Sequence, residues 1–277
     1  MTQELAAVSG AAGQQQQRLS DAVTRVVAAV VELADACAQP QGHPLIDAIV
    51  ADPPAEPGLV ARLARSAGWP LPVRVAVAVL DGPPRSPFPA PPAGLLADLA
   101  GPEPVLVLPD PDGPGRAAMI DATLGRYSQG RAAAIGPAVP LAGAARSLRW
   151  ARQALGLARR GIIAADGPVR AADHLSTLLL LADEDLARTL LGGYLTPLAR
   201  LRPGQRERLA QTMLAWLQFG ENAAEVAHYM HVHPQTVRYR LRQIQELFGD
   251  QLRDPDRRLD LQLALRARDL LGVPLAR

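Results

Sequence analysis

The stretch NAAEVAHYMHVHPQTVRYRLRQIQELFG, residues 222–249, decides the fold of the C-terminal part of this chain. Asn222 is a good helix N-cap, and Glu225 three residues later completes a capping-box pair, so a helix is predicted to begin directly after Asn222. Pro234 cannot continue that helix, but its fixed φ and its missing N–H suit the first turn of a second helix. Gly249 stands where the second helix is expected to end. The stretch therefore predicts two helices joined by a tight corner.

The second helix has one apolar face and one polar face. Residues spaced by four, three and four positions form the predicted buried stripe: Val237, Leu241, Ile244 and Phe248. The opposite face carries side chains that can donate or accept hydrogen bonds: Gln235, Thr236, Tyr239, Arg242 and Gln243, with Arg238 and Arg240 on the flanks. Such a face is unsuited to a core, so we expect it to lie on the surface.

A short helix, a tight corner and a second helix with an exposed polar face follow the plan of the helix-turn-helix, whose second helix enters the major groove of DNA. Small Ala227 lies where the two helices must approach closely. The alternative is a solvated basic helix in an ordinary bundle. The residues predicted to contact DNA are His233, Gln235, Thr236, Arg238, Tyr239, Arg240, Arg242 and Gln243. Of these, His233 is expected either to cap the turn or to meet a phosphate.

The run HVHPQTVRYRLRQI at 231–244 closely resembles the signature of the PucR/CdaR family of bacterial transcription regulators. The similarity extends over TMLAWLQFGEN at 212–222 and FGDQLRDPDRRLDLQLALR at 248–266. The resemblance implies a Fis-like helix-turn-helix in the C-terminal domain.

Residues 132–166 resemble the GGDEF-like middle domain usual in that family, which is related in fold to diguanylate cyclases. The chain has no GGDEF or GGEEF motif. The nearest candidate for a metal-binding hairpin, Asp110-Pro111-Asp112-Gly113, contains a proline and lacks tandem glycines. We therefore expect a regulatory or dimerising middle domain without catalytic residues or cofactor.

Charge and composition are consistent with a modular DNA-binding protein. The chain has 277 residues, 48% of them hydrophobic, which is enough for two domains with real cores. The net charge is only +2 and there is no lysine, but Arg200 to Arg277 contains 13 Arg against 9 Asp and Glu, a local balance of +4. The single cysteine, Cys37, excludes an internal disulfide. With no signal-peptide pattern and no long apolar run, a cytoplasmic protein is expected.

The predicted domains are a disordered tail (1–17), an N-terminal helical segment (18–68), a degenerate GGDEF-like domain (69–167), a helical connector (168–203) and a helix-turn-helix domain (204–277). In the N-terminal segment, apolar residues recur at alternating spacings of four and three: Leu19, Val23, Val26, Val30, Leu33 and Cys37. This a/d seam predicts either a homodimer contact or packing against its own domain, and both readings stay open.

The expected fold class is mixed α and β and multidomain, with an N-terminal helix, a central α/β sandwich and an all-α C-terminal domain. Strands are predicted at 73–80, 105–108, 116–121, 131–139 and 161–165. Helices are predicted at 44–50, 59–67, 95–99, 122–129, 141–160, 205–219 and 257–271, and the proline-rich stretch 81–92 is predicted to be a loop. Leucines of the connector at 173–199 are expected to be buried between helices. In the last helix, Leu259, Leu263 and Leu270 are expected to close the core of the C-terminal domain.

Two further clusters have plainer readings. His228, His231 and His233 lie close together, but no carboxylate or cysteine completes a metal set, so no metal is predicted. The arginines of the helix at 141–160 could bind an acidic partner or a nucleotide phosphate, or they form a solvated face over the sheet. The function predicted is a sequence-specific, double-stranded-DNA-binding regulator that acts as a homodimer on an inverted repeat and is controlled by an unidentified signal through its middle domain. A small-molecule effector is the candidate for that signal. The alternatives are a protein that binds or turns over nucleotides in its middle domain, and an interaction adaptor whose DNA reader has decayed.

Overall fold

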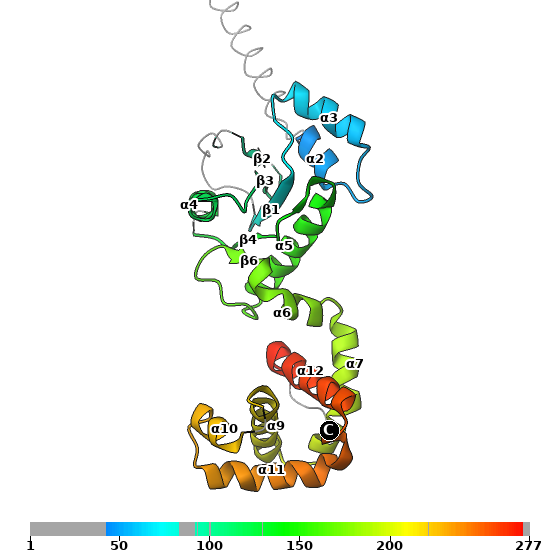
Figure 1. Cartoon of the computed structure of the whole chain (residues 1–277), viewed down its shortest axis with the longest axis vertical. Helices are drawn as coiled ribbons and strands as arrows, with labels where there is room; N and C mark the ends of the chain where they lie inside the picture. Colours follow the sequence, from blue (N-terminus) through cyan, green and yellow to red (C-terminus); the bar gives the residue numbers. More distant parts are fainter. Residues whose placement is uncertain are drawn as a thin grey trace, which may run out of the picture.

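The computed structural model describes residues 43–82, 92, 94–99, 101–128, 130–220 and 222–273. The predicted tail, the seam at 18–38 and most of the loop at 81–92 lie outside these residues. Figure 1 shows a sheet-containing body at the top and an all-helical body below it, joined by the segment that runs through α6 and α7. The architecture is mixed α and β, as predicted.

The upper body, which we call the middle domain, is built on one mixed sheet. Its strands are β1 (Arg74–Leu80), β2 (Leu96–Asp98), β3 (Val105–Pro109), β4 (Ala133–Ile135), β5 (Val139–Pro140) and β6 (Val169–Arg170). The order is β2-β3-β1-β4-β6, with β5 also paired to β1. All pairs are antiparallel except β4 with β6.

Helices cover both faces of the central strand. Successive side chains of a strand point to opposite faces, and in β1 the valines at 75, 77 and 79 face one core while Ala76, Ala78 and Leu80 face another. The first core is covered by α2 (Pro44–Val50), α3 (Pro57–Ser66) and α5 (Ala144–Arg159), the second by α4 (Arg116–Ser128). Burial on both faces explains why β1 is apolar along almost its whole length.

The predicted strand at 131–139 is interrupted between β4 and β5. Gly136 passes so close to α5 that a Cβ there would stand 2.0 Å from the carbonyl oxygen of Ser147. The Ser147 hydroxyl enters the gap, accepting a hydrogen bond from the Val77 N–H at 3.0 Å and donating one to the Pro137 carbonyl at 2.8 Å. A helix side chain thus satisfies a backbone group of β1 that the ladder leaves unpaired.

Three other predictions for this domain are wrong. Residues 95–99 contain strand β2 rather than a helix, because Leu96 pairs with Val107 of β3. Residues 116–121 are the first half of helix α4 rather than a strand. The last strand is β6 at 169–170 rather than 161–165. The GGDEF-like identity of the domain stays a prediction.

The connector is a chain of short elements rather than one helix. It comprises η2 (Ala171–His174), α6 (Leu175–Leu180), α7 (Glu184–Tyr194) and α8 (Thr196–Ala199). Asp183 caps α7 by accepting a hydrogen bond from the Leu186 N–H at 2.9 Å, which restarts the chain as a separate helix.

The lower body, which we call the reader domain, contains α9 (Pro203–Gln218), α10 (Ala223–Tyr229), α11 (Pro234–Phe248), η3 (Gly249–Leu252) and α12 (Pro255–Leu271). Its core is formed by residues of α7 to α9, α11 and α12, including Leu198, Leu209, Met213, Ile244 and Leu265. A second cluster joins α9, α10 and α11 around Val226, Ala227 and Val237.

Of the three leucines predicted to close this core, Leu259 and Leu263 are exposed, and Leu270 is half-buried against the core of the middle domain. The buried residues on α12 are Leu261, Ala264, Leu265 and Ala267, whereas Leu259 is 56% exposed and Leu263 is 37% exposed. Three connector leucines expected to be buried are exposed as well: Leu175, Leu179 and Leu186. The sequence of α12 offers two apolar faces, one with Leu259 and Leu263 and one with Leu261 and Leu265. Packing against α7 and α9 buries the second face rather than the predicted first one.

Candidate nucleic-acid interface

Helix α10 begins at the predicted cap. The Asn222 side-chain oxygen accepts hydrogen bonds from the N–H groups of Ala224 at 3.0 Å and Glu225 at 3.4 Å. The Asn222 amide also donates to the Glu225 carboxylate at 2.8 Å. The carboxylate therefore stabilises the capping side chain itself, a variation on the usual box in which it binds the backbone.

The corner between α10 and α11 has the hydrogen bonds of a Schellman motif. The Val232 N–H donates to the Ala227 carbonyl at 3.0 Å and the His231 N–H donates to the His228 carbonyl at 3.2 Å. Val232 also packs on the small cluster that contains Ala227. His231 occupies the left-handed position of this motif with φ of 54°, where glycine is the usual residue. The corner thus fixes the angle between α10 and α11 through local contacts.

Helix α11 begins at Pro234, with His233 as its N-cap. The Nδ1 atom of His233 accepts a hydrogen bond from the Gln235 N–H at 3.2 Å. Of the predicted stripe, Val237, Ile244 and Phe248 are buried and Leu241 is half-buried. Of the two roles expected for His233, the structure shows the capping role. The His233 residue is exposed at the N-terminal end of α11.

The outward face of α11 carries four of the predicted DNA contacts in the open. Gln235, Arg238, Tyr239 and Arg242 are all exposed, with Tyr239 at 57%. Within the described part of the chain, no carboxylate lies within 4.0 Å of the Arg238 or Arg242 guanidinium. Gln243 is half-buried and its amide donates to the Tyr239 hydroxyl at 3.1 Å. The face therefore offers cations that are not neutralised by the protein.

Arg240 lies differently from the other two arginines of α11. It is half-buried, and its Nη1 donates to the Thr212 hydroxyl of α9 at 3.2 Å. Thr212 is fully buried and in turn donates to the Arg208 carbonyl at 2.7 Å. Burial, together with the positive charge of Arg208, lowers the pKa of the Arg240 guanidinium. Two cations held close without an intervening acid would be stabilised by an anion between them.

A groove of about 630 Å³ runs between α11 and the start of α9. Its α11 wall contains Thr236, Tyr239, Arg240 and Gln243, all predicted as DNA contacts. Its α9 wall contains Arg202, Gln205 and Arg208, which we did not predict. These three residues lie just before and within the first turns of a helix that begins at a proline. The sequence alone could have marked them as candidate anion contacts, because helix N-termini favour anions. The sequence does not show that the start of α9 lies beside α11.

The middle domain holds several of its charged residues in internal pairs. The Asp110-to-Gly113 segment is a turn between β3 and α4 rather than a hairpin. Asp110 accepts from the Arg74 N–H at 3.1 Å, and Asp112 pairs with the Arg74 side chain at 3.1 Å.

Several arginines of α5 are also paired: Arg152 with Glu103 at 2.7 Å, Arg159 with Asp81 at 2.5 Å, and Arg160, its C-cap, with Glu184 of α7. These contacts favour the plainer reading of the basic helix, as a solvated face with local ion pairs.

The described residues contain no group of three or more His, Cys, Asp or Glu side chains placed to hold a metal ion. Among the helices of those same residues, none is both long and apolar enough to cross a bilayer.

Residues 209–267 match the family model described as the PucR C-terminal helix-turn-helix domain. A curated relative, the purine catabolism regulatory protein of Bacillus subtilis (strain 168), is 36% identical over 104 residues, which is 37% of this chain and 19% of that protein. The chain thus matches about a fifth of the length of this relative. A crystal structure of a regulator of polyketide synthase expression from Bifidobacterium adolescentis aligns over 83% of this chain and 92% of that one, with 19% identity and a TM-score of 0.39.

Proposed function

Since residues 209–267 form a helix-turn-helix domain of the PucR family, we propose that the chain is a transcription regulator that binds double-stranded DNA through the outward face of α11. The observation that carries this proposal is the set of exposed side chains on α11. Arg238 and Arg242 on this face have no acidic partner among the described residues, while the opposite face is buried against α9 and α10. The B. subtilis relative is by its name also a regulator.

Two kinds of contact are proposed from the positions of the side chains. Gln235, Arg238 and Arg242 lie three and four residues apart on the exposed face and are assigned to base edges, because Gln and Arg pair bidentately with adenine and guanine in the major groove. Thr236, Tyr239 and Gln243 line the groove beside α9 and are assigned to the adjacent sugar-phosphate backbone.

The cations of the groove are assigned to phosphate. Arg202, Arg208 and Arg240 surround a space open to solvent. A phosphate there would relieve the repulsion between Arg208 and Arg240, and the first turn of α9 adds its dipole. Arg240 therefore contributes to affinity on any sequence, whereas Arg238 and Arg242 discriminate between sequences. His233, already used as a cap through Nδ1, is assigned to phosphate only through its remaining ring edge.

Gel retardation with the DNA upstream of the chain's own gene tests the proposal. Arg242→Ala should weaken specific binding by roughly 1–3 kcal/mol and leave binding to random DNA almost unchanged. Arg208→Ala should weaken both and reduce the slope of log K against log salt by about 0.9. Arg253→Ala is the matched control, since Arg253 is exposed and its one ion pair within the described residues is with Asp250 in η3. No retardation at low salt by the wild-type chain would support the adaptor alternative instead.

The homodimer is proposed on the geometry of DNA recognition, and its control by a signal is carried over from the sequence prediction. One helix-turn-helix covers one half-site, so two copies on an inverted repeat are the expected arrangement. Light scattering of the full chain and of a chain lacking residues 1–40 separates the two readings of the N-terminal seam. A mass that falls from dimer to monomer on deletion supports the seam as the contact, and an unchanged dimer rules it out.

The alternative of an enzyme that acts on nucleotides would need carboxylates to hold a metal ion, and the candidates, Asp110 and Asp112, already contact Arg74. Asp110 accepts from the Arg74 N–H and Asp112 forms an exposed ion pair with the Arg74 side chain, so a metal ion would have to compete with these contacts. Release of pyrophosphate or phosphate from nucleoside triphosphates by the purified chain is the measurement that would favour this alternative.

A further inference from the structure

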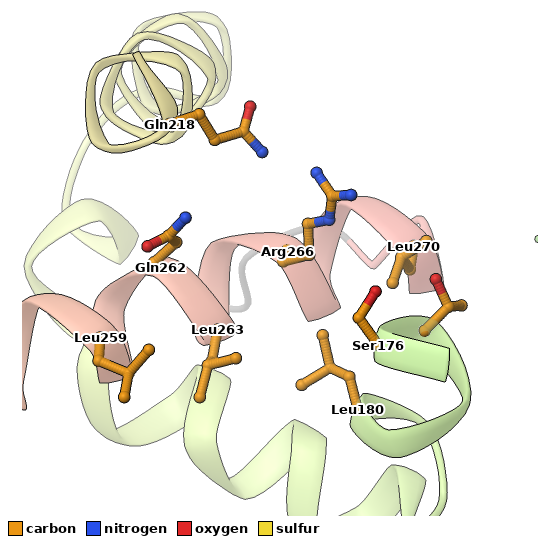
Figure 2. Close-up of a pocket in the computed structure, with 9 residues that line it drawn as sticks. Ser176, Leu180, Gln218, Leu259, Gln262, Leu263, Arg266 and Leu270 are labelled. Carbon is orange, nitrogen blue, oxygen red and sulfur yellow. The ribbon is translucent and has the colours of Figure 1, made fainter. Parts of the chain in front are cut away.

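A pocket of about 350 Å³ lies between the connector and the reader domain. Figure 2 shows its lining residues, which come from α6, α9 and α12. Its volume falls in the range of small-molecule sites. No part of the proposed DNA interface contributes to it, since its α9 residue is Gln218 at the opposite end of that helix from Arg202 and Arg208.

One side of the pocket is polar and positively charged. The side chains of Gln262 and Arg266 on α12 and Gln218 on α9 point into the same gap (Figure 2). Within the described residues, no carboxylate lies within 4.0 Å of the Arg266 guanidinium, whereas Arg268 of the same helix is paired with Glu207. The pocket therefore presents hydrogen-bond donors and one uncompensated positive charge.

The other side of the pocket is apolar. Leu259, Leu263 and Leu270 of α12 and Leu180 of α6 line it. Leu259 and Leu263 remain 56% and 37% exposed although α12 buries its core face with other residues. Covering them would gain hydrophobic free energy that folding of this chain does not gain by itself.

We propose that this pocket binds a small amphipathic carboxylate, a monocarboxylate with an aliphatic or aryl chain. Arg266 would bind the carboxylate through two parallel N–H···O bonds, the preferred geometry of that pair, and the glutamine amides would donate to its remaining lone pairs. The leucines would cover the chain. A single cation beside an apolar wall matches one carboxylate better than a nucleotide, whose several phosphate charges call for more cations.

The position of the pocket gives such binding a consequence. Ser176, Thr177 and Leu180 belong to α6, which packs on the middle-domain core through Leu178. Helix α12 belongs to the reader core through Leu261 and Leu265, and its last turn also touches the middle-domain core through Leu270. A ligand held between α6 and α12 would favour one relative placement of the two domains over others. This consequence, unlike the binding itself, rests on the proposed function, because it matters only if the reader binds DNA.

Isothermal titration calorimetry of the full chain with octanoate tests the binding without DNA. We expect saturable binding of octanoate, none of 1-octanol or inorganic phosphate, and affinity about ten- to a hundred-fold weaker in Arg266→Gln, because charge-assisted hydrogen bonds are lost. Arg253→Gln is the matched control: it removes an exposed arginine outside the pocket and should bind as the wild type does. Leu263→Gln should weaken binding while Arg266 is kept. Unchanged melting temperatures would show that the variants are folded.

Three outcomes overturn the proposal. The first is no octanoate binding by the folded wild type at about 1 mM, a concentration that detects even weak ligands. The second is equal affinity in wild type and Arg266→Gln, which would place the ligand elsewhere. The third outcome is that Leu263→Gln has a lower molecular mass than the wild type in light scattering and that neither protein binds octanoate. This result would make the face a contact between two copies of the chain. A chain that binds octanoate but does not retard DNA would keep the pocket and refute only the function proposed above.

Discussion

Replacing His231 by glycine should stabilise the reader domain, although glycine usually weakens helical proteins. His231 has φ of 54° in the corner between α10 and α11. In this left-handed region the Cβ of an L-residue approaches the following carbonyl oxygen, at a cost of roughly 1–2 kcal/mol. Glycine removes that cost, but its greater conformational entropy in the unfolded chain lowers the free energy of unfolding by roughly 0.4–1 kcal/mol. The net expectation is a stabilisation of roughly 0.5–1 kcal/mol.

Valine at the same position should have the opposite effect. A β-branched side chain is a genuine outlier at positive φ, so His231→Val should destabilise the domain by roughly 1–3 kcal/mol. The corner hydrogen bonds, from the N–H groups of His231 and Val232, use only backbone atoms and are available to all three residues. The comparison therefore isolates backbone strain from hydrogen bonding.

Differential scanning calorimetry of the full chain is the assay, with amide hydrogen exchange over 223–248 assigning the reader transition. For a domain of this size the glycine variant should melt about 2–8 °C higher. His228→Gly is the matched control: His228 is exposed in the last turn of α10, where glycine should cost roughly 0.5–1 kcal/mol. If His231→Gly lowered the melting temperature as His228→Gly does, the imidazole rather than the backbone would be what His231 contributes, and the strain reasoning would be refuted.

Three other perturbations test the middle domain and its link to the reader. Gly136→Ala should destabilise the middle domain by roughly 1–3 kcal/mol in urea unfolding, because the new Cβ would stand 2.0 Å from a carbonyl oxygen of α5; Gly125→Ala, in open space on α4, should instead be neutral or stabilising. Ser147→Ala should cost roughly 1–3 kcal/mol in the same assay, because it leaves a buried N–H of β1 without an acceptor; a neutral result would mean that the strand finds another partner. The hydrogen bond from Arg160, followed by the positive charge of Arg160, lowers the pKa of Glu184. The ion pair should therefore stabilise the fold at pH values above the ordinary carboxyl pKa, and this stabilisation should be lost as the pH falls through the lowered pKa of Glu184. A small melting-temperature difference between wild type and Glu184→Gln should therefore exist at neutral pH and vanish in acid, and a difference that persisted in acid would contradict the assignment to this ion pair.

The helix-turn-helix could be predicted from sequence because its determinants are local. The Asn222 cap, the proline at the start of α11 and the spacing of Val237, Ile244 and Phe248 act within one or two turns, and all are found as expected. The Schellman corner was not predicted, since histidine stands at the position where glycine would have signalled it.

The errors fall where distant pairing decides the local structure. Residues 96–98 have no strong strand pattern, and β3 makes them a strand by pairing with them. The strand expected at 131–139 breaks because α5 approaches Gly136, a contact between segments that no local pattern reveals. On α12 the leucines at 259 and 263 fit an apolar stripe as well as Leu261 and Leu265 do, and only packing against α7 and α9 separates them.

The same packing explains why net charge understates the electrostatic character of the reader domain. The balance of +4 over residues 200–277 averages over arginines with quite different surroundings. On α12 and η3, Arg268 and Arg253 are matched by nearby carboxylates, so they add little to the field at a distance. On α11 and the start of α9, Arg208, Arg238 and Arg242 have no such partner in the described chain. Unpaired positive charge therefore gathers where α11 meets the groove, apart from that of Arg266 on α12, and salt should act on DNA binding chiefly through the side chains at the groove.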